Sequence, residues 1–228
     1  MTAAMEDTQG QREGARHSIL IVDDHALIRQ ALHQLITRQL DLEVGGEAVD
    51  LVGSLALVES EQPDLAIVDL VLKDAHGLEL IPQIKSRSPS TRILVLSMHD
   101  EKLYAERCLR AGAQGYVQKR DAVDRVLEGI RTVLGGQIYV SESVSEEILS
   151  RIVQKKAAEG AEVERLSNRE LQLLELLAEG LTAKEMAEQL DLSVKTIHTY
   201  REKLKSKLGL DNIYQLIRYA VAWKLRRT

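Results

Sequence analysis

Polar side chains stand at the ends of apolar runs in the first half of the chain. The clearest run covers residues 65–68 and leads directly into Asp69, with Pro63 upstream as a breaker. Continuous apolar runs of this length predict strands buried on both faces, as in parallel sheets. Taken alone, Asp69 could equally well end a strand or start a turn. Five polar residues follow such runs: Asp23, Asp24, Asp69, Ser97 and Lys119.

These five side chains could perform phosphoryl chemistry if the fold gathers them. The carboxyl ends of parallel strands meet at one edge of an open α/β sheet, where ligands bind. Three carboxylates gathered there repel one another unless a cation joins them, and hard oxygen ligands suit Mg²⁺. A carboxylate held beside Mg²⁺, an ammonium and a hydroxyl is equipped to attack a phosphoryl group, because those neighbours offset charge on the phosphoryl oxygens.

Strands and helices must alternate to bring these residues together. Apolar runs predict strands at 18–22, 42–46, 65–70, 92–97 and 116–117, and helical periodicity predicts helices near 28–36, 51–60, 77–85, 101–110 and 123–133. Five strands that alternate with five helices indicate an α/β fold with a doubly wound five-stranded parallel sheet. In this fold the strand ends would share one edge.

Composition narrows the class of protein. The 228 residues include 44% apolar and 29% charged side chains, and the net charge is -5. The single Cys108 excludes an internal disulfide and a multi-cysteine zinc site, which suits a cytoplasmic protein. No apolar run is long enough for a membrane span, and we expect residues 1–16 to form a disordered tail.

Residues 17–136 resemble the receiver domain of a two-component response regulator, which has a flavodoxin-like fold. The resemblance implies that Asp69 is the phospho-acceptor and that Ser97 and Lys119 contact the phosphoryl group. It further implies that Mg²⁺ is bound by Asp23, Asp24, Asp69 and the backbone carbonyl of Val71. Gly77 and Tyr116 also fit the family pattern, with Tyr116 as a switch residue or simply a packed core residue.

Two positions depart from the common receiver pattern. Arg120 stands where many receivers have proline after the lysine, and Lys73 stands where many have proline four residues past the acceptor. Both substitutions occur in one large branch of the family, so the chemistry is expected to be intact. His25, His76 and His99 are expected to be loop residues near the site, without an assigned role.

The second half of the chain changes in character. Residues 137–162 carry few apolar side chains and predict a helical, partly flexible linker. Residues 163–228 predict four helices. The first two begin with capping boxes, formed by Ser167 with Glu170 and by Thr182 with Glu185. Ser193 is the N-cap of the third helix, and Asp211 opens the fourth. From residue 165 onward there are 12 Lys and Arg against 8 Asp and Glu, whereas the preceding part is acidic.

The third of these helices has the features of a DNA-recognition helix. Two short helices joined by a tight turn, the second of them basic, form the helix-turn-helix plan for entering a major groove. If Ile197, Leu204 and Leu208 face the core, the opposite face is polar and basic. A solvated helix face is the alternative. The candidate DNA contacts are Lys195, Thr196, His198, Thr199, Arg201, Glu202, Lys203 and Lys205.

Residues 163–228 resemble the LuxR-type DNA-binding domain. The resemblance rests on residues 166–170, 178–187, 193–197 and 207–209. A receiver followed by this domain is the layout of the NarL/FixJ family. Tyr200 and Glu202 depart from frequent residues of the recognition helix, so base preference does not transfer. The fourth helix, with an apolar stripe continuing to Trp223, is a candidate dimer contact.

The resemblance implies a response regulator transcription factor. Transfer of a phosphoryl group from a sensor histidine kinase to Asp69 would control dimerisation and sequence-specific binding to double-stranded DNA. Such a protein is not an enzyme beyond catalysing its own phosphorylation and dephosphorylation. Two alternatives stay open: an aspartate-nucleophile phosphoester hydrolase, against which Val71 stands where a second acid is usual, and a docking module with constitutive DNA binding.

Overall fold

A computed structural model describes residues 16–72, 77–121, 123–154, 163 and 165–225. The N-terminal residues 1–15, most of the predicted tail, lie outside the described part, as do Lys73 and His76. The first half is built on one sheet in the order β2-β1-β3-β4-β5, with every neighbouring pair parallel. Its strands are β1 (His17–Val22), β2 (Leu42–Ala48), β3 (Leu65–Val68), β4 (Arg92–Ser97) and β5 (Gly115–Gln118).

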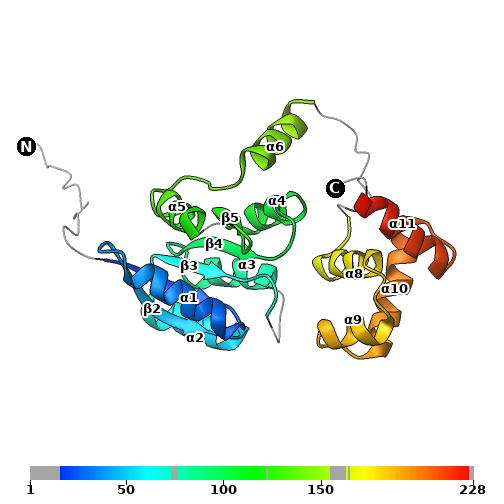
Figure 1. Cartoon of the computed structure of the whole chain (residues 1–228), viewed down its shortest axis with the longest axis horizontal. Coiled ribbons are helices and arrows are strands. Elements are labelled where there is room, and N and C mark those ends of the chain that lie inside the picture. Colours follow the sequence, from blue (N-terminus) through cyan, green and yellow to red (C-terminus); the bar gives the residue numbers. More distant parts are fainter. Residues whose placement is uncertain (1–15, 73–76, 122, 155–162, 164, 226–228) are drawn as a thin grey trace, which may run out of the picture.

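Helices cover both faces of this sheet (Figure 1). Side chains of β1 alternate between the two faces, since Ile19 and Ile21 belong to one buried cluster, and Leu20 and Val22 to the other. The cluster of Ile19 includes residues of α1 (Ala26–Thr37) and α5 (Val123–Leu134). The opposite cluster includes residues of α2 (Leu51–Glu61), α3 (Gly77–Arg87) and α4 (Glu101–Ala111). The predicted doubly wound α/β fold is therefore confirmed.

The beginning of the linker pairs with the sheet. Tyr139 forms a parallel bridge with Gly115, and the backbone N–H of Tyr116 donates to the Tyr139 carbonyl at 2.8 Å. The linker then forms α6 (Glu142–Gln154), whose Val144 is buried. Residues 155–162 lie outside the described part. The extended pairing at Tyr139 was not predicted, because a single bridge leaves no apolar alternation in the sequence.

The C-terminal part consists of α8 (Asn168–Ala178), α9 (Ala183–Gln189), α10 (Val194–Leu208) and α11 (Ile213–Leu225). Both predicted capping boxes are present, and Ser193 accepts from the Thr196 N–H as an N-cap. We refer to α8–α11 as the helical domain. Its α8 faces the α4 side of the sheet domain (Figure 1). None of the helices in the described ranges has both the length and the apolarity needed to cross a membrane.

Two predictions for the last helix are wrong. The helix begins at Ile213 rather than at Asp211, because the Asn212 side chain accepts from the Gln215 N–H at 3.0 Å. Trp223 does not extend an exposed stripe, because it is only 7% exposed and belongs to the core with Leu216 and Ala220. The large apolar residues that α11 exposes are Tyr214, Ile217, Val221 and Leu225.

Candidate functional site

Lys119 joins two aspartates at the carboxyl edge of the sheet. Its Nζ lies 2.6 Å from Asp69 Oδ2 and 2.6 Å from Asp23 Oδ2. All three side chains are nearly inaccessible to solvent, at 2–4% exposure. Burying an unpaired carboxylate costs free energy, and the buried ammonium of Lys119 offsets this cost for both aspartates. The contact with Asp69 is a hydrogen bond, and the contact with Asp23 is an ion pair without hydrogen-bond geometry.

Backbone hydrogen bonds beyond the strand ends fix these residues. The N–H of Asp69 donates to the Val22 carbonyl at 2.9 Å, and the N–H of Lys119 donates to the Ser97 carbonyl at 2.8 Å. Each functional residue is therefore held by the parallel ladder that positions its strand. Since neighbouring strands end at the same level, residues far apart in the sequence meet at this edge.

Burial shapes the chemistry of Asp69. Burial raises the pKa of its carboxyl group, the charge of Asp23 adds to the rise, and the ammonium of Lys119 opposes it. The Val71 N–H also stabilises the carboxylate. Asp69 is a poorly hydrated carboxylate, and its ionised form depends on nearby positive charge.

The acidic cluster fits a divalent cation. Ligand atoms of Asp23, Asp24, His25 and Asp69 all lie within 4.8 Å of one another. Two oxygens of this cluster, Asp23 Oδ2 and Asp24 Oδ1, are buried without a hydrogen-bond partner in the described structure. Oxygen atoms of this kind are suitable ligands for Mg²⁺, which prefers carboxylates and keeps several waters. The fold thus gathers the three predicted carboxylate ligands, Asp23, Asp24 and Asp69.

His25 belongs to this cluster, although the sequence suggested only a loop residue. Its Nδ1 lies 2.7 Å from Asp24 Oδ1 and 3.2 Å from Asp23 Oδ1, and its backbone N–H donates to Asp23 Oδ1 at 2.8 Å. The available signal was its place directly after the acidic pair. These contacts orient the two carboxylates toward a common point.

Ser97 and Tyr116 lie on the neighbouring strands β4 and β5. Ser97 is fully buried, and its Oγ accepts a hydrogen bond from the His99 backbone N–H at 3.2 Å. Tyr116 is 1% exposed, and its hydroxyl donates to the His99 carbonyl at 2.9 Å. Both residues therefore hold the same backbone unit of the β4–α4 loop. The contact is compatible with a packed core residue and with a switch residue.

Gly77 makes room for the chain that follows Asp69. A side chain at this position would place its Cβ 1.9 Å from the Asp69 carbonyl oxygen, well inside van der Waals contact. Gly77 N–H also donates to the Leu70 carbonyl at 2.9 Å. Glycine is required here because α3 begins in contact with the backbone of Asp69.

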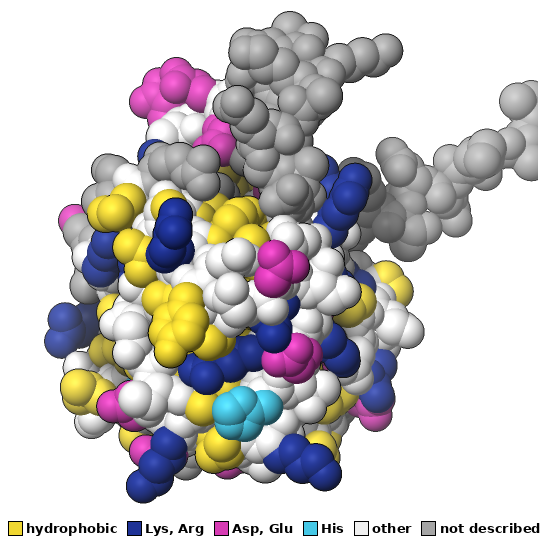
Figure 2. All heavy atoms as spheres, turned by 90° about the vertical axis from the view of Figure 1, so that its right-hand side faces the viewer, with side chains coloured by type: hydrophobic (Ala, Val, Ile, Leu, Met, Phe, Trp, Pro, Cys, Tyr) yellow, Lys and Arg dark blue, Asp and Glu magenta, His cyan; other side chains and the backbone are white. Residues whose placement is uncertain are grey.

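The recognition helix α10 presents most of its predicted DNA contacts to solvent. Ile197, Leu204 and Leu208 are buried, as predicted. The exposed face includes Lys195, His198, Thr199, Glu202 and Lys203. Figure 2 shows the side of the molecule on which the helical domain lies, where Lys and Arg side chains are interspersed with apolar ones.

Three other predicted contacts are less accessible. Arg201 is partly buried, and its Nη2 lies 3.6 Å from the Met186 sulfur. Burial lowers the pKa of this guanidinium. The Thr196 hydroxyl is hydrogen bonded to Ser193 at 2.7 Å, and Lys205 forms an ion pair with Glu202 at 2.9 Å. The structure thus places these three side chains mainly in contacts within the helical domain.

Comparison with known proteins agrees with this geometry. Residues 19–131 match the response regulator receiver domain, and residues 164–220 match the luxR family of bacterial regulatory proteins. A putative transcriptional regulator of Pseudomonas aeruginosa is 37% identical over 89% of this chain and 96% of its own length. The oxygen regulatory protein NreC of Staphylococcus aureus is 35% identical over 91% and 98%.

Solved structures of similar proteins include RcsB of Salmonella enterica serovar Typhimurium bound to the promoter P1flhDC with the phosphomimetic BeF3-. That structure has a TM-score of 0.60 and 26% identity, and the match covers 91% of this chain and 99% of RcsB. A structure of two RcsB dimers on two parallel DNAs has a TM-score of 0.56 and 28% identity, covering 90% and 97%.

The fold, the acidic edge and the helix-turn-helix together define a response regulator, in which a receiver precedes a LuxR-type DNA-binding domain. Within that class, the chain belongs to the NarL/FixJ family of transcriptional regulators.

Proposed function

We propose that Asp69 accepts a phosphoryl group from a phosphohistidine of a sensor histidine kinase, and that its state controls DNA binding. The observation that carries this proposal is the buried contact of Lys119 with Asp69 and Asp23. A buried carboxylate remains ionised only when cations lie nearby, and the same cations can bind the negatively charged oxygens of a phosphoryl group. The proposed division is a receiver at 17–136, a linker at 137–162 and a DNA-binding domain at 163–228.

The transfer step requires little more than positioning. An Asp69 carboxylate oxygen attacks phosphorus, the P–N bond of phosphohistidine breaks, and an acyl phosphate forms. Lys119 contributes its ammonium to the transferred group, and the Ser97 hydroxyl donates to one of its oxygens. Asp23, Asp24, Asp69 and the Val71 carbonyl would hold Mg²⁺. When bound, the ion neutralises charge on the phosphoryl oxygens. Self-phosphorylation and dephosphorylation are then the only reactions that this chain catalyses.

The DNA-binding half acts through the exposed face of α10. Lys195, His198 and Thr199 lie near the start of the helix, the end that a helix-turn-helix directs toward base edges. Lys203 contacts phosphates, while Thr196, Arg201, Glu202 and Lys205 support the same surface. RcsB, a similar protein, is bound to the promoter P1flhDC in its structure, which supports this proposal. We also place the protein in the cytoplasm, where the DNA lies.

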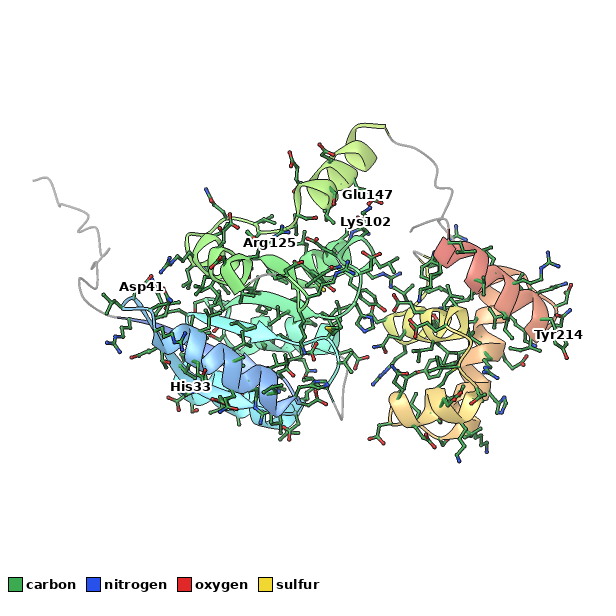
Figure 3. The ribbon with its side chains drawn as sticks, viewed as in Figure 1. His33, Asp41, Lys102, Arg125, Glu147 and Tyr214 are labelled. Carbon is green, nitrogen blue, oxygen red and sulfur yellow. The ribbon has the colours of Figure 1, made fainter. Side chains whose placement is uncertain are left out.

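The phosphorylated chain forms a homodimer through α11. Its exposed apolar residues Tyr214, Ile217, Val221 and Leu225 follow helical spacing and form one stripe. Figure 3 shows Tyr214 pointing away from the receiver. A pair of such stripes would bury apolar surface across a two-fold axis. RcsB, a similar protein, forms dimers on DNA, which supports a dimer for this chain as well.

Labelling with a small phosphodonor tests the role of Asp69. The unaltered chain should acquire one acid-labile phosphoryl group in the presence of Mg²⁺, Asp69→Ala should acquire none, and the exposed control Asp124→Asn should label normally. Persistent labelling of Asp69→Ala would remove Asp69 from this role. Sustained turnover of a phosphoester would favour the hydrolase. Equal DNA affinity with and without beryllium fluoride, a phosphoryl analogue, would favour constitutive binding.

A further inference from the structure

His25 places an imidazole nitrogen at the acidic cluster. Its Nδ1 lies 2.7 Å from Asp24 Oδ1 and 3.2 Å from Asp23 Oδ1. Together with Asp69, these residues offer one ligand atom each, and the four atoms all lie within 4.8 Å of one another. The cluster is therefore a mixed set of one nitrogen and three carboxylate oxygens, whereas the proposed Mg²⁺ site uses oxygen atoms alone.

The contact between His25 and Asp24 is short, yet it lacks the geometry of a hydrogen bond. Asp24 Oδ1 is inaccessible to solvent and has no hydrogen-bond partner in the described structure, although Nδ1 lies 2.7 Å away. Asp23 Oδ2 is also without such a partner, and its side chain is only 2% exposed. Two neighbouring ligands of an octahedral ion lie about 3 Å apart when the bonds are about 2.1 Å long. The spacing of Nδ1 and Oδ1 is close to this value.

The backbone fixes His25 in this place. Its N–H donates to Asp23 Oδ1 at 2.8 Å, and its carbonyl accepts from the N–H groups of Ile28 and Arg29 at 3.1 Å each. His25 is the N-cap residue of α1, but among the described residues its side chain makes no cap hydrogen bond. The side chain is 62% exposed, so an ion can reach it from solvent. The imidazole is therefore positioned in advance and accessible.

The charge of the cluster also favours a divalent cation. Lys119 brings one ammonium to three carboxylates and contacts two of them, Asp23 and Asp69. Arg29 donates to the backbone carbonyl of Asp23 at 2.8 Å, but its guanidinium is paired with Glu47 at 3.5 Å. Carboxylates at this spacing repel one another unless further positive charge joins them. A bound divalent ion supplies that charge.

An imidazole changes which divalent cation such a site prefers. Mg²⁺ is a hard cation that binds carboxylate, carbonyl and water oxygens. Imidazole is better suited to first-row transition ions, whose affinity for a given site rises from Mn²⁺ through Co²⁺ to Ni²⁺. Carboxylates also suit Mn²⁺, so a site with three carboxylates and one imidazole matches this ion well.

We propose that His25 Nδ1 is a direct metal ligand beside the carboxylates of Asp23, Asp24 and Asp69, and that it gives this site a preference for first-row transition ions such as Mn²⁺ over Mg²⁺. This inference rests on the proposed function for the place of the ion. Binding of the ion does not itself require transfer of a phosphoryl group, so the two can be tested separately.

Pulsed electron paramagnetic resonance of Mn²⁺ bound to the full chain tests direct ligation. The unaltered protein should show hyperfine coupling to a coordinated nitrogen. His25→Gln should lose this coupling while Mn²⁺ remains bound, because the carboxylates are still present. His33→Gln is the matched control on α1, since His33 Nδ1 contacts Glu47 at 2.7 Å, and it should keep the coupling. No nitrogen coupling in the unaltered protein, or coupling that persists in His25→Gln, would overturn the proposal.

Competition for the bound Mn²⁺ measures the preference at this site. His25→Gln should weaken binding of Ni²⁺ by about tenfold, that of Mn²⁺ by about threefold and that of Mg²⁺ by less than about twofold. Equal losses for the three ions would mean that His25 only orients the carboxylates, and the proposal would be wrong. Asp24→Asn should abolish most Mn²⁺ binding. Binding that survives Asp24→Asn would reveal an adventitious ion only, held elsewhere on the chain.

Labelling of Asp69 with a small phosphodonor connects the ion to the proposed function. In the unaltered chain, labelling should half-saturate at a lower concentration of Mn²⁺ than of Mg²⁺, and His25→Gln should narrow this difference. If Asp69 fails to label with any ion while the nitrogen coupling is present, the proposed function fails and the assignment of His25 stands. If Asp69 labels normally and the nitrogen coupling is absent, the proposed function stands and His25 is not a ligand.

Discussion

Replacing Lys119 by methionine should show how strongly the stability of the buried Asp23–Asp69 pair depends on one ammonium. The Lys119 Nζ contacts Asp69 and Asp23 at 2.6 Å each, in a region where the three side chains are at most 4% exposed. Removing one partner of a buried ion pair leaves an uncompensated charge and costs about 3–5 kcal/mol. We expect Lys119→Met to lose stability of this order at pH 8 without divalent ions.

The loss should depend on pH in a defined direction. Burial already raises the pKa of Asp69 above 3.8, and Lys119 is the largest opposing influence, so the variant raises this pKa further. A folded chain with a raised carboxyl pKa binds more protons than the unfolded chain, so stability falls as pH rises above the unfolded value. The penalty is therefore smallest near pH 5 and largest near pH 8, and Mg²⁺ should reduce it.

Urea denaturation followed by circular dichroism at pH 5 and pH 8, with and without Mg²⁺, measures this effect. Lys85→Met is the control, because Lys85 donates to the Thr91 carbonyl at 2.7 Å and its contacts lie away from the aspartates. Its cost should be about 1 kcal/mol and unaffected by Mg²⁺. Equal penalties for Lys119→Met at both pH values would refute the view that Lys119 neutralises buried carboxylates.

Three further outcomes are expected. Gly77→Ala should destabilise the receiver by about 1–3 kcal/mol and slow the labelling of Asp69, because the added Cβ overlaps the Asp69 backbone. Thermal unfolding measures the loss of stability, and labelling with a phosphodonor measures the rate. Glu170→Gln should destabilise the helical domain. Burial alone would raise the pKa of Glu170, but Lys207 and Ser167 lower this pKa below 4.5. The ionised Glu170 therefore stabilises the unaltered chain above pH 4.5, and this stabilisation is lost as pH falls through the folded pKa; denaturation at pH 3 and pH 7 measures the difference. The variant Lys203→Ala should reduce the slope of log affinity against log salt by about 1 in filter-binding titrations, because Lys203 is assigned to one phosphate contact.

Most of the acidic edge of the sheet could be predicted because parallel strands end together. Once residues 65–68 and 18–22 were interpreted as neighbouring buried strands, Asp69 and Asp23 had to share an edge, and the strand before Lys119 joined them. Capping boxes were equally predictable, because the hydroxyl and the glutamate that satisfy each other are three residues apart. In these cases the physical cause is local or follows from strand order.

Contacts between the domains could not be predicted in this way. His99 and Tyr104 gave no sign that they meet Glu175, because the pairing depends on how two separately folded units lie against each other. The start of α11 was misplaced for a smaller reason: Asp211 and Asn212 are both good caps, and only the hydrogen bond from Gln215 decides between them. Burial of Trp223 depends on which face of α11 packs against α8.

The bridge between Gly115 and Tyr139 has a practical consequence for the sheet. β5 is an outermost strand, and its unpaired backbone groups would otherwise be a template for another chain. The residues that follow α5 pair with part of the outer edge of β5. A receiver fragment that ends at Leu134 would lack these residues and would expose that edge to pairing with another chain. A fragment ending after Ser141 should therefore stay monodisperse at concentrations at which the shorter one aggregates.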